Sequence, residues 1–157
     1  MIKKILAAIT GIAIAFTTSS ATAVGDWNVH NNFSYDVTKI IDTPGKVYYV
    51  AENNLFHYDK DVDETYGYTI RNGLNDVVVK SIYYNTDADY LLVVYQTGNI
   101  DLIYPDGEIV NMGDIASASQ IADKTVNDVA FSGDKAYIAA GFGIAVFDTA
   151  DQTVVES

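Results

Sequence analysis

Apolar and polar positions repeat along the chain with a step of 44 or 45 residues. Each copy has an apolar run, a tight turn of polar residues or glycine, and a second run in which apolar and polar residues alternate. Leu55, Ile100 and Ile144 fall at the same place in the three copies. Runs rich in Val, Ile and Tyr that are separated by such turns are typical of short β-strands. The copies are residues 47–58, 92–103 and 136–147.

Shorter apolar runs on either side of each copy complete it to four strands, in units of about 35–70, 77–112 and 124–157. Four strands in about 45 residues are the size of one β-propeller blade. A sandwich or barrel is the alternative, but its strands would alternate strictly. We therefore predict an all-β fold, a β-propeller with about three four-stranded antiparallel blades. The second strand of each unit is apolar almost throughout, which predicts burial on both faces; these strands are residues 47–51, 91–95 and 136–140.

Three blades do not close a ring, because propellers typically use four to eight blades. Open end blades would leave apolar faces and unpaired strand edges. We expect the chain to be the N-terminal part of a larger propeller, and closure by self-association is the alternative. Only residues 115–122 offer a candidate helix.

The first 23 residues have the pattern of a secretory signal peptide. Two lysines precede an apolar run of twelve residues, a polar stretch follows, and Ala21 and Ala23 form an A-x-A cleavage site. Twelve helical residues reach about 18 Å, which is too short for a bilayer core of roughly 30 Å. We expect export across the inner membrane to the periplasm or the outer-membrane surface.

The composition excludes several classes of protein. The chain has 157 residues, of which 9 are basic and 21 acidic, and loss of Lys3 and Lys4 with the leader takes the net charge from −12 to −14. Such a chain offers no basic face for nucleic acid. It has no cysteine, so a disulfide, a thiolate metal site and a lipid-anchored cysteine are excluded. No later run approaches 18 apolar residues, so we expect no transmembrane segment in the mature chain.

No motif for catalysis or for a cofactor stands out, and we predict neither. Two histidines follow the leader, His30 and His57. The other copies have Leu102 and Val146 at the place of His57, which favours a packed, hydrogen-bonded side chain over a catalytic one. Residues 59–64 begin like a calcium loop, but Glu64 occupies the place of the turn glycine. We interpret this stretch as a solvated loop, with a calcium site as the alternative.

The aromatic residues invite a sugar-binding interpretation. The chain has twelve tyrosines, six phenylalanines and one tryptophan, and aromatic rings are common at recognition surfaces. Most of the tyrosines fall inside predicted strands, where they would pack between blades. Trp27, Tyr35 and Phe142 are the candidates for surface contact because they lie near turns or near the start of the mature chain.

Several motifs carry a family resemblance. The Asn-Gly-Leu-x-Asp core at residues 72–76 resembles the blade junction of the two-component-regulator propeller repeats. Longer patterns, in their order along the chain, resemble the N-terminal β-propeller family of PorZ-like proteins of the type IX secretion system of Bacteroidota. These patterns are residues 25–30 with 35–38, residues 98–102, and residues 126–129 with 141–144.

The resemblance implies a place and a set of partners. Members of this family carry two propellers and a C-terminal sorting domain, and they sit on the cell surface in an attachment complex with a sortase. They are thought to present anionic lipopolysaccharide to that sortase. A net charge of −14 opposes direct attraction to a polyanionic glycan unless a divalent cation bridges the two.

We therefore expect a non-enzymatic cell-surface binding or scaffold module. The alternative is a periplasmic ligand-sensing propeller of a two-component-type regulator, which would share the Asn-Gly-Leu junction. An enzyme on a propeller scaffold, such as a glycan lyase or hydrolase, would need a convergent pair of carboxylates or a His–Tyr pair on the blade tops. Acidic residues such as Asp101 and Asp128 look scattered, and we interpret them as loop residues that favour solubility.

Overall fold

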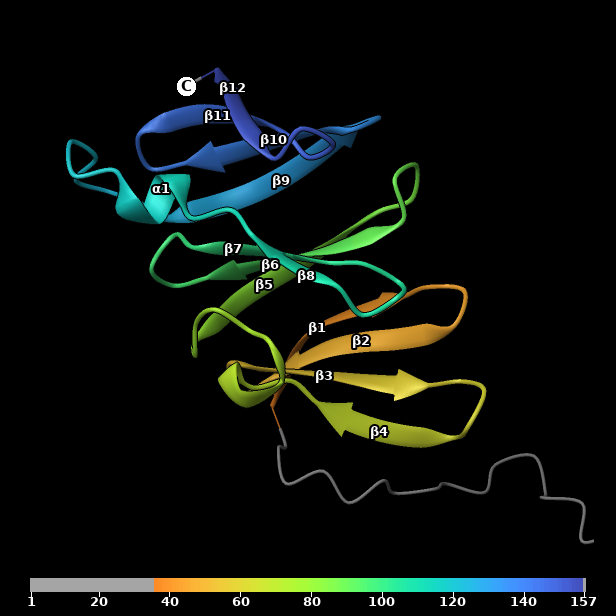
Figure 1. Cartoon of the computed structure of the whole chain (residues 1–157). Coiled ribbons are helices and arrows are strands. Elements are labelled where there is room, and N and C mark those ends of the chain that lie inside the picture. The colour runs from red at the N-terminus through yellow and green to blue at the C-terminus, as the bar shows by residue number, and fades with distance from the viewer. Residues whose placement is uncertain (1–35, 157) are drawn as a thin grey trace, which may run out of the picture. The chain divides into compact units, whose positions relative to one another are not determined.

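The structure, a computed structural model, describes residues 36–156 of the chain. Its strands form three four-stranded antiparallel sheets, which follow one another along the sequence and stack in that order (Figure 1). Within each sheet the strands lie in sequence order. This arrangement confirms the predicted β-propeller fold with three antiparallel blades. The predicted signal peptide, residues 1–23, and His30 lie outside the described residues.

Two kinds of tight turn connect the first three strands of the first sheet. The Thr43 N–H donates to the Lys46 carbonyl over 2.9 Å and closes the first hairpin. Glu52 and Asn53 adopt φ values of 45° and 63°, which allow the chain to reverse between the second and third strands. The strands are β1 (Val37–Asp42), β2 (Lys46–Ala51), β3 (Asn54–Asp59) and β4 (Glu64–Gly67).

The second and third sheets repeat this plan after linkers that contain one turn of helix each. The first linker contains the 3-10 helix η1 (Ile70–Asn72), and the second contains α1 (Asp114–Ser117), which overlaps the candidate helix at 115–122. The second sheet consists of β5 (Val79–Asn85), β6 (Tyr90–Tyr95), β7 (Ile100–Ile103) and β8 (Ile109–Asn111). The third sheet consists of β9 (Val126–Ser132), β10 (Lys135–Ala140), β11 (Gly143–Asp148) and β12 (Thr153–Glu156).

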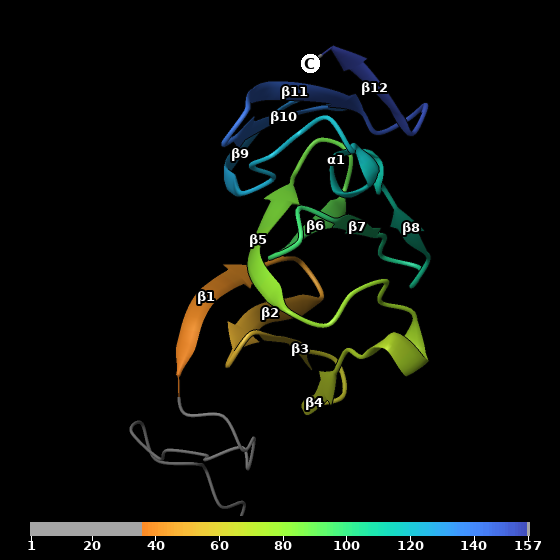
Figure 2. The same cartoon turned by 90° about the vertical axis from the view of Figure 1, so that its left-hand side faces the viewer.

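The core lies in two layers between the stacked sheets. One layer joins Tyr48, Val50 and Leu55 of the first sheet to the second sheet, and the other joins the second sheet to the third. The first strands β1, β5 and β9 lie along one side of the stack, and the fourth strands lie toward the other side (Figure 2). Each repeat of the sequence therefore forms one sheet, and a core layer packs between each pair of successive sheets.

The second strands are not buried alike. All six residues of β6 are buried, whereas β2 and β10 are buried at only some positions. The prediction of burial on both faces is thus confirmed for β6 and wrong for β2 and β10. Among the described residues only the second sheet has a sheet on each side, and these two neighbours cover both faces of its strands.

Candidate functional site

The loops of the described residues gather at two ends of the stacked sheets. The linker end, at the left of Figure 1, consists of linkers 68–78 and 112–125 and the turns β2–β3, β6–β7 and β10–β11. The hairpin end, at the right, consists of the other hairpin turns. Loops carried on a rigid scaffold are the usual place for binding residues.

The Asn-Gly-Leu junction holds the first linker in place. The Asn72 side-chain amide donates to the Gly67 carbonyl over 2.9 Å, and its oxygen accepts the Thr69 N–H. Gly73 adopts a φ of 120°, a conformation that side chains other than glycine rarely permit. Leu74 then turns into the core between the first and second sheets. The motif that carries the family resemblance is therefore a structural joint.

A buried carboxylate fastens this joint to the second sheet. Asp101, in β7, is 0% exposed and accepts hydrogen bonds from four donors. Asn75 donates its backbone N–H and its side-chain amide over 2.9 and 3.0 Å, the Tyr95 hydroxyl donates over 2.6 Å, and the Asn111 amide over 2.8 Å. Burial, and then the bond to Asp101, raises the pKa of the Tyr95 hydroxyl, which keeps it a donor.

The interpretation of Asp101 as a loop residue that favours solubility is wrong. An acidic residue in an alternating strand usually faces water, but β7 belongs to the sheet that is covered on both faces. Asp128 is exposed, as expected, although it lies in the strand β9 rather than in a loop. All four donors around Asp101 are structural groups of the joint and the sheet.

The linker end has a hollow of about 410 Å³ beside η1. Leu55 and Leu74 line its apolar part, and Ile70 and Val77 are exposed beside them. Arg71, the only arginine of the chain, also lines the hollow and makes no ion pair with another described residue. An exposed guanidinium beside aliphatic side chains is a common anchor in protein interfaces.

A second hollow, of about 320 Å³, lies beside α1. Asp114 and Ile115 of α1 line it, and its lining by described residues includes no basic side chain. Phe142, a predicted surface contact, lines this hollow from the β10–β11 turn, but it also packs against the core between the second and third sheets. Its role in binding stays a prediction.

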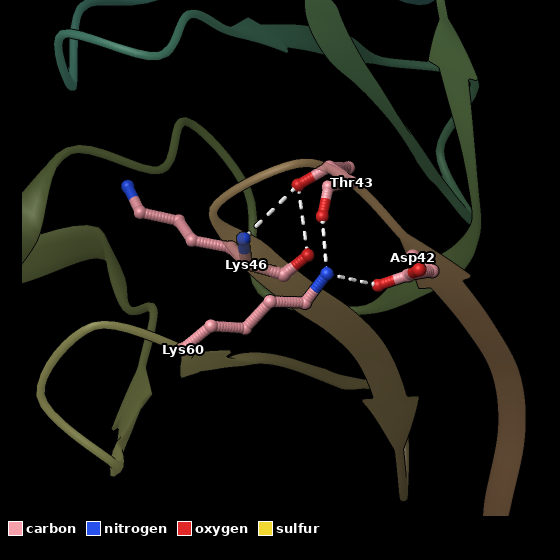
Figure 3. Close-up of polar contacts among 4 residues, drawn as sticks. All are labelled: Asp42, Thr43, Lys46 and Lys60. Carbon is pink, nitrogen blue, oxygen red and sulfur yellow. Dashed lines mark hydrogen bonds and ion pairs between the residues drawn. The ribbon is translucent and has the colours of Figure 1, made fainter.

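At the hairpin end, a groove of about 180 Å³ separates the first sheet from the second. Figure 3 shows the turn that forms one wall. The Lys60 ammonium bonds Asp42 and the Thr43 carbonyl, at 2.5 and 2.6 Å, and fixes this turn. The Lys46 side chain extends away from this pair and makes no ion pair or side-chain hydrogen bond with a described residue (Figure 3).

The opposite wall of the groove belongs to the second sheet. The Tyr84 hydroxyl donates to Asp89, and burial, followed by that bond, raises the pKa of Tyr84 to about 12. The corresponding position between the second and third sheets is closed. There the Asn85 amide donates to the Gly133 carbonyl over 2.8 Å, and the Tyr90 and Phe131 rings meet edge to face.

His57 lies in an aromatic cluster on the same face of the first sheet as Lys46. Its ring centroid is 5.2 to 5.7 Å from those of Tyr48, Tyr66 and Tyr68. Burial, and then the charge of Lys46, lowers the pKa of the His57 imidazole. The histidine is packed as expected, but its Nδ1 is buried without a hydrogen-bond partner among the described residues, so the predicted hydrogen bond is missing at this atom.

The stretch considered as a calcium loop forms the β3–β4 turn. The Asp59 carboxylate accepts the backbone N–H groups of Asp61 and Val62, and Asp63 accepts the Tyr58 hydroxyl. Within residues 36–156 no group of three or more acidic or histidine side chains could hold a metal ion. These carboxylates therefore have a structural use in the turn.

The other predicted site residues fall outside the described residues. They are the cleavage residues Ala21 and Ala23 and the surface candidates Trp27 and Tyr35. Sequence reasoning missed Arg71 and Lys46. The sequence did carry a signal for Arg71, since it is the only arginine of an acidic chain. It carried none for Lys46, because the groove beside Lys46 forms only when separate turns meet in the folded chain.

Comparison with known proteins gives one family. Residues 47–157 match the family of the N-terminal β-propeller domain of PorZ, a type IX secretion protein. The solved structure of PorZ, an essential bacterial surface component of the type IX secretion system of Porphyromonas gingivalis, is 32% identical to the chain. It covers 75% of this chain and 16% of its own, with a TM-score of 0.71. No curated protein matches the chain significantly.

The extracellular domain of BT4673 from B. thetaiotaomicron is similar in fold. It is 16% identical over 83% of this chain and 18% of its own, with a TM-score of 0.66. The chain thus spans less than a fifth of the length of either solved structure. Within the described residues, no helix has the length and apolar character needed to cross a membrane.

Proposed function

The chain belongs to the PorZ N-terminal β-propeller family, and on this premise we propose that it is a non-enzymatic binding module at the surface of the cell that exports it. The observation that carries the proposal is the match to PorZ, at 32% identity over 75% of the chain. PorZ itself is a surface component of type IX secretion. The module would serve the same apparatus.

We propose that its partner is a protein of the attachment complex, namely the sortase. The linker end suits such a role, because it presents Arg71 with exposed Ile70 and Val77 beside a hollow. The polar residues behind this surface are engaged in holding the linker, which leaves a rigid support for docking.

Anionic lipopolysaccharide would reach the complex through another part of the protein or through a bridging divalent cation. Half of the six described lysines already have a partner for the ammonium group. Lys60 pairs with Asp42, and Lys80 and Lys124 donate to backbone carbonyls at 2.5 and 2.6 Å. The acidic balance of the chain opposes a glycan of the same sign.

Deletion of the gene in its host tests the proposal. Cargo proteins should then appear in the medium instead of on the cell surface, and the wild-type gene should restore their attachment. Complementation with Arg71→Glu should restore attachment poorly, whereas the control Lys135→Glu, at an exposed lysine of the third sheet, should restore it fully. Normal cargo attachment in the deletion strain would contradict the proposal.

The same deletion separates the alternative, a periplasmic sensor of a two-component-type regulator. BT4673, which is described as a one-component or hybrid two-component system, shares the fold at 14 to 16% identity. A sensor would leave cargo attachment intact and alter transcription in response to a ligand. Measuring transcripts and surface cargo in one deletion strain therefore decides between the two functions.

A further inference from the structure

The groove at the hairpin end has the size of a pocket for one aromatic ring. Its volume is about 180 Å³. An apolar cavity of about 150 Å³ can hold benzene. The groove therefore admits a single ring, and it is too small for several sugar units. Its lining is mostly apolar and includes Pro44, Leu91, Ile103 and Pro105.

The polar groups along the groove leave one free cation. The Thr43 hydroxyl is occupied by the Lys46 backbone, at 2.8 and 3.3 Å, and the Tyr84 hydroxyl is occupied by Asp89. The Lys46 ammonium has no hydrogen bond or ion pair with another described residue, although the residue is half-buried. An ammonium without a partner attracts an anion beside it.

The negative charges near the groove give a ligand one orientation. Asp89 lines the groove, and Asp59 pairs with Lys46 in the register of β2 and β3. Burial, and after it the charges of these two carboxylates, raises the pKa of the Tyr48 hydroxyl. The Asp59 carboxylate already accepts N–H groups of its own turn. An anionic group entering the groove is thus repelled from the side of Asp89 and attracted to Lys46.

A sugar is a poor fit for this lining. Sugar recognition needs several side-chain donors and acceptors around the ring. Here the hydroxyls of Thr43, Tyr48 and Tyr84 already have partners within the protein. An apolar ring leaves no such group unsatisfied. Side chains fill the corresponding gap between the second and third sheets. Two stacked sheets therefore do not form a groove at this end unless the side chains there leave space.

We propose that the groove binds an aromatic side chain that has a carboxylate next to it. A partner protein would present such a group as an aromatic residue at its C-terminus. The ring enters between Pro44 and Leu91, and the carboxylate pairs with Lys46. This site lies at the opposite end from Arg71, so it does not depend on the proposed function.

The probe is 3-phenylpropionate, which joins an aromatic ring to a carboxylate. Titration of the isotope-labelled chain, followed by NMR, should shift the amide signals of residues 43–48 and 84–91. The neutral analogue 3-phenylpropanol should bind about two- to fivefold more weakly, which is the range that an exposed ion pair supplies. Glucuronate, a carboxylate on a sugar ring, should cause no shift at these residues.

Two pairs of variants test the residues. Lys46→Gln should weaken 3-phenylpropionate about two- to fivefold, whereas Lys135→Gln should not. Lys46 and Lys135 are the first residues of equivalent strands and pair with Asp59 and Asp148. Gly45 lines the groove, and a Cβ there would meet no atom within 4 Å. Gly45→Trp should abolish binding by filling the groove, and Gly45→Ala should keep it.

Three results would overturn the proposal. The first is an absence of shifts at these residues up to the solubility limit of 3-phenylpropionate. The second is equal binding of glucuronate, which would indicate a sugar-acid site. The third is an equal effect of Lys46→Gln and Lys135→Gln. That result would mean that Lys46 acts only through the net charge of the chain and makes no direct contact with the ligand. The amide NMR spectrum of each variant, recorded in the same titration, shows whether the variant is folded.

Discussion

The second and third sheets have the same register but very different burial. Ile100 pairs with Val94 in the second sheet, and Ile144 pairs with Ala139 in the third. Ile100 is 0% exposed, whereas Ile144 is 64% exposed. The difference lies in the neighbours, because the face that carries Ile100 packs against the third sheet. A repeat in sequence thus specifies strands and register, and burial depends on what each sheet stacks against.

The largest expected effect concerns the buried carboxylate of the second sheet. Asp101→Ala removes the buried acceptor of the Tyr95 hydroxyl and of the Asn75 backbone N–H, and one acceptor of the side-chain amides of Asn75 and Asn111. We expect a loss of at least about 3 kcal/mol in the free energy of unfolding. Urea unfolding followed by circular dichroism measures it.

Asp128→Ala is the matched control for Asp101→Ala. Asp128 is exposed; it accepts the N–H of the next residue over 2.9 Å and a hydrogen bond from the Tyr83 hydroxyl. We expect its removal to cost at most about 1 kcal/mol. Equal losses at the two positions would contradict the distinction between a covered and an uncovered sheet.

Truncation of the two equivalent isoleucines should give the next largest difference. Ile100→Ala creates a cavity between two sheets and should cost about 2 to 5 kcal/mol. Ile144→Ala removes atoms that are mostly in water and should change stability by less than about 0.5 kcal/mol. The urea midpoints of the two variants, measured at one protein concentration, check the comparison. A large loss for Ile144→Ala would mean that its face is covered in solution.

A smaller effect is expected where the first sheet departs from the second. The first sheet has His57 at the register position of Leu102. The buried Nδ1 of His57 has no partner in the described part of the chain, and such a group costs about 1 to 3 kcal/mol. His57→Leu should therefore raise the free energy of unfolding by about 1 kcal/mol. A loss of stability would show that the ring contacts with the three tyrosines outweigh the unpaired nitrogen.

The smallest effect is the pH dependence that His57 adds. Burial and the Lys46 charge lower the pKa of His57 in the folded chain below its ordinary value of 6.5. As the pH falls below about 6.5, the unfolded chain binds a proton that the folded chain does not, so stability is lost. The melting temperature should fall more between about pH 7.5 and pH 5.5 in the wild type than in His57→Leu. Parallel curves would exclude this linkage.

The fold followed from the sequence to a large extent. Three copies with Leu55, Ile100 and Ile144 in register predicted three antiparallel blades, because turn residues and apolar runs act locally. The burial of β2 and β10 did not follow, since an apolar strand carries no information on whether a sheet covers it. Asp101 was misinterpreted for the same reason, because its alternating run looks like that of a half-exposed strand.

The candidate sites followed to a smaller extent. Phe142 was found from its place in a turn, but its packing against the core was not. The groove at Lys46 forms because the β1–β2 turn of the first sheet meets residues of the second sheet. Between the second and third sheets the contact from Asn85 to Gly133 closes the corresponding gap. Side-chain contacts of this kind are set by tertiary packing, which local patterns do not record.

Native-state hydrogen exchange tests the account most directly, because it reports the protection of each strand separately. The amides of β6 and β7 should be the slowest to exchange, and those of β10 and β11 should exchange faster. Ile100→Ala should speed exchange in β6 and β7, and Ile144→Ala should leave the pattern unchanged. Equal protection of the second and third sheets would contradict the claim that stacking between two sheets, rather than the repeat itself, determines burial.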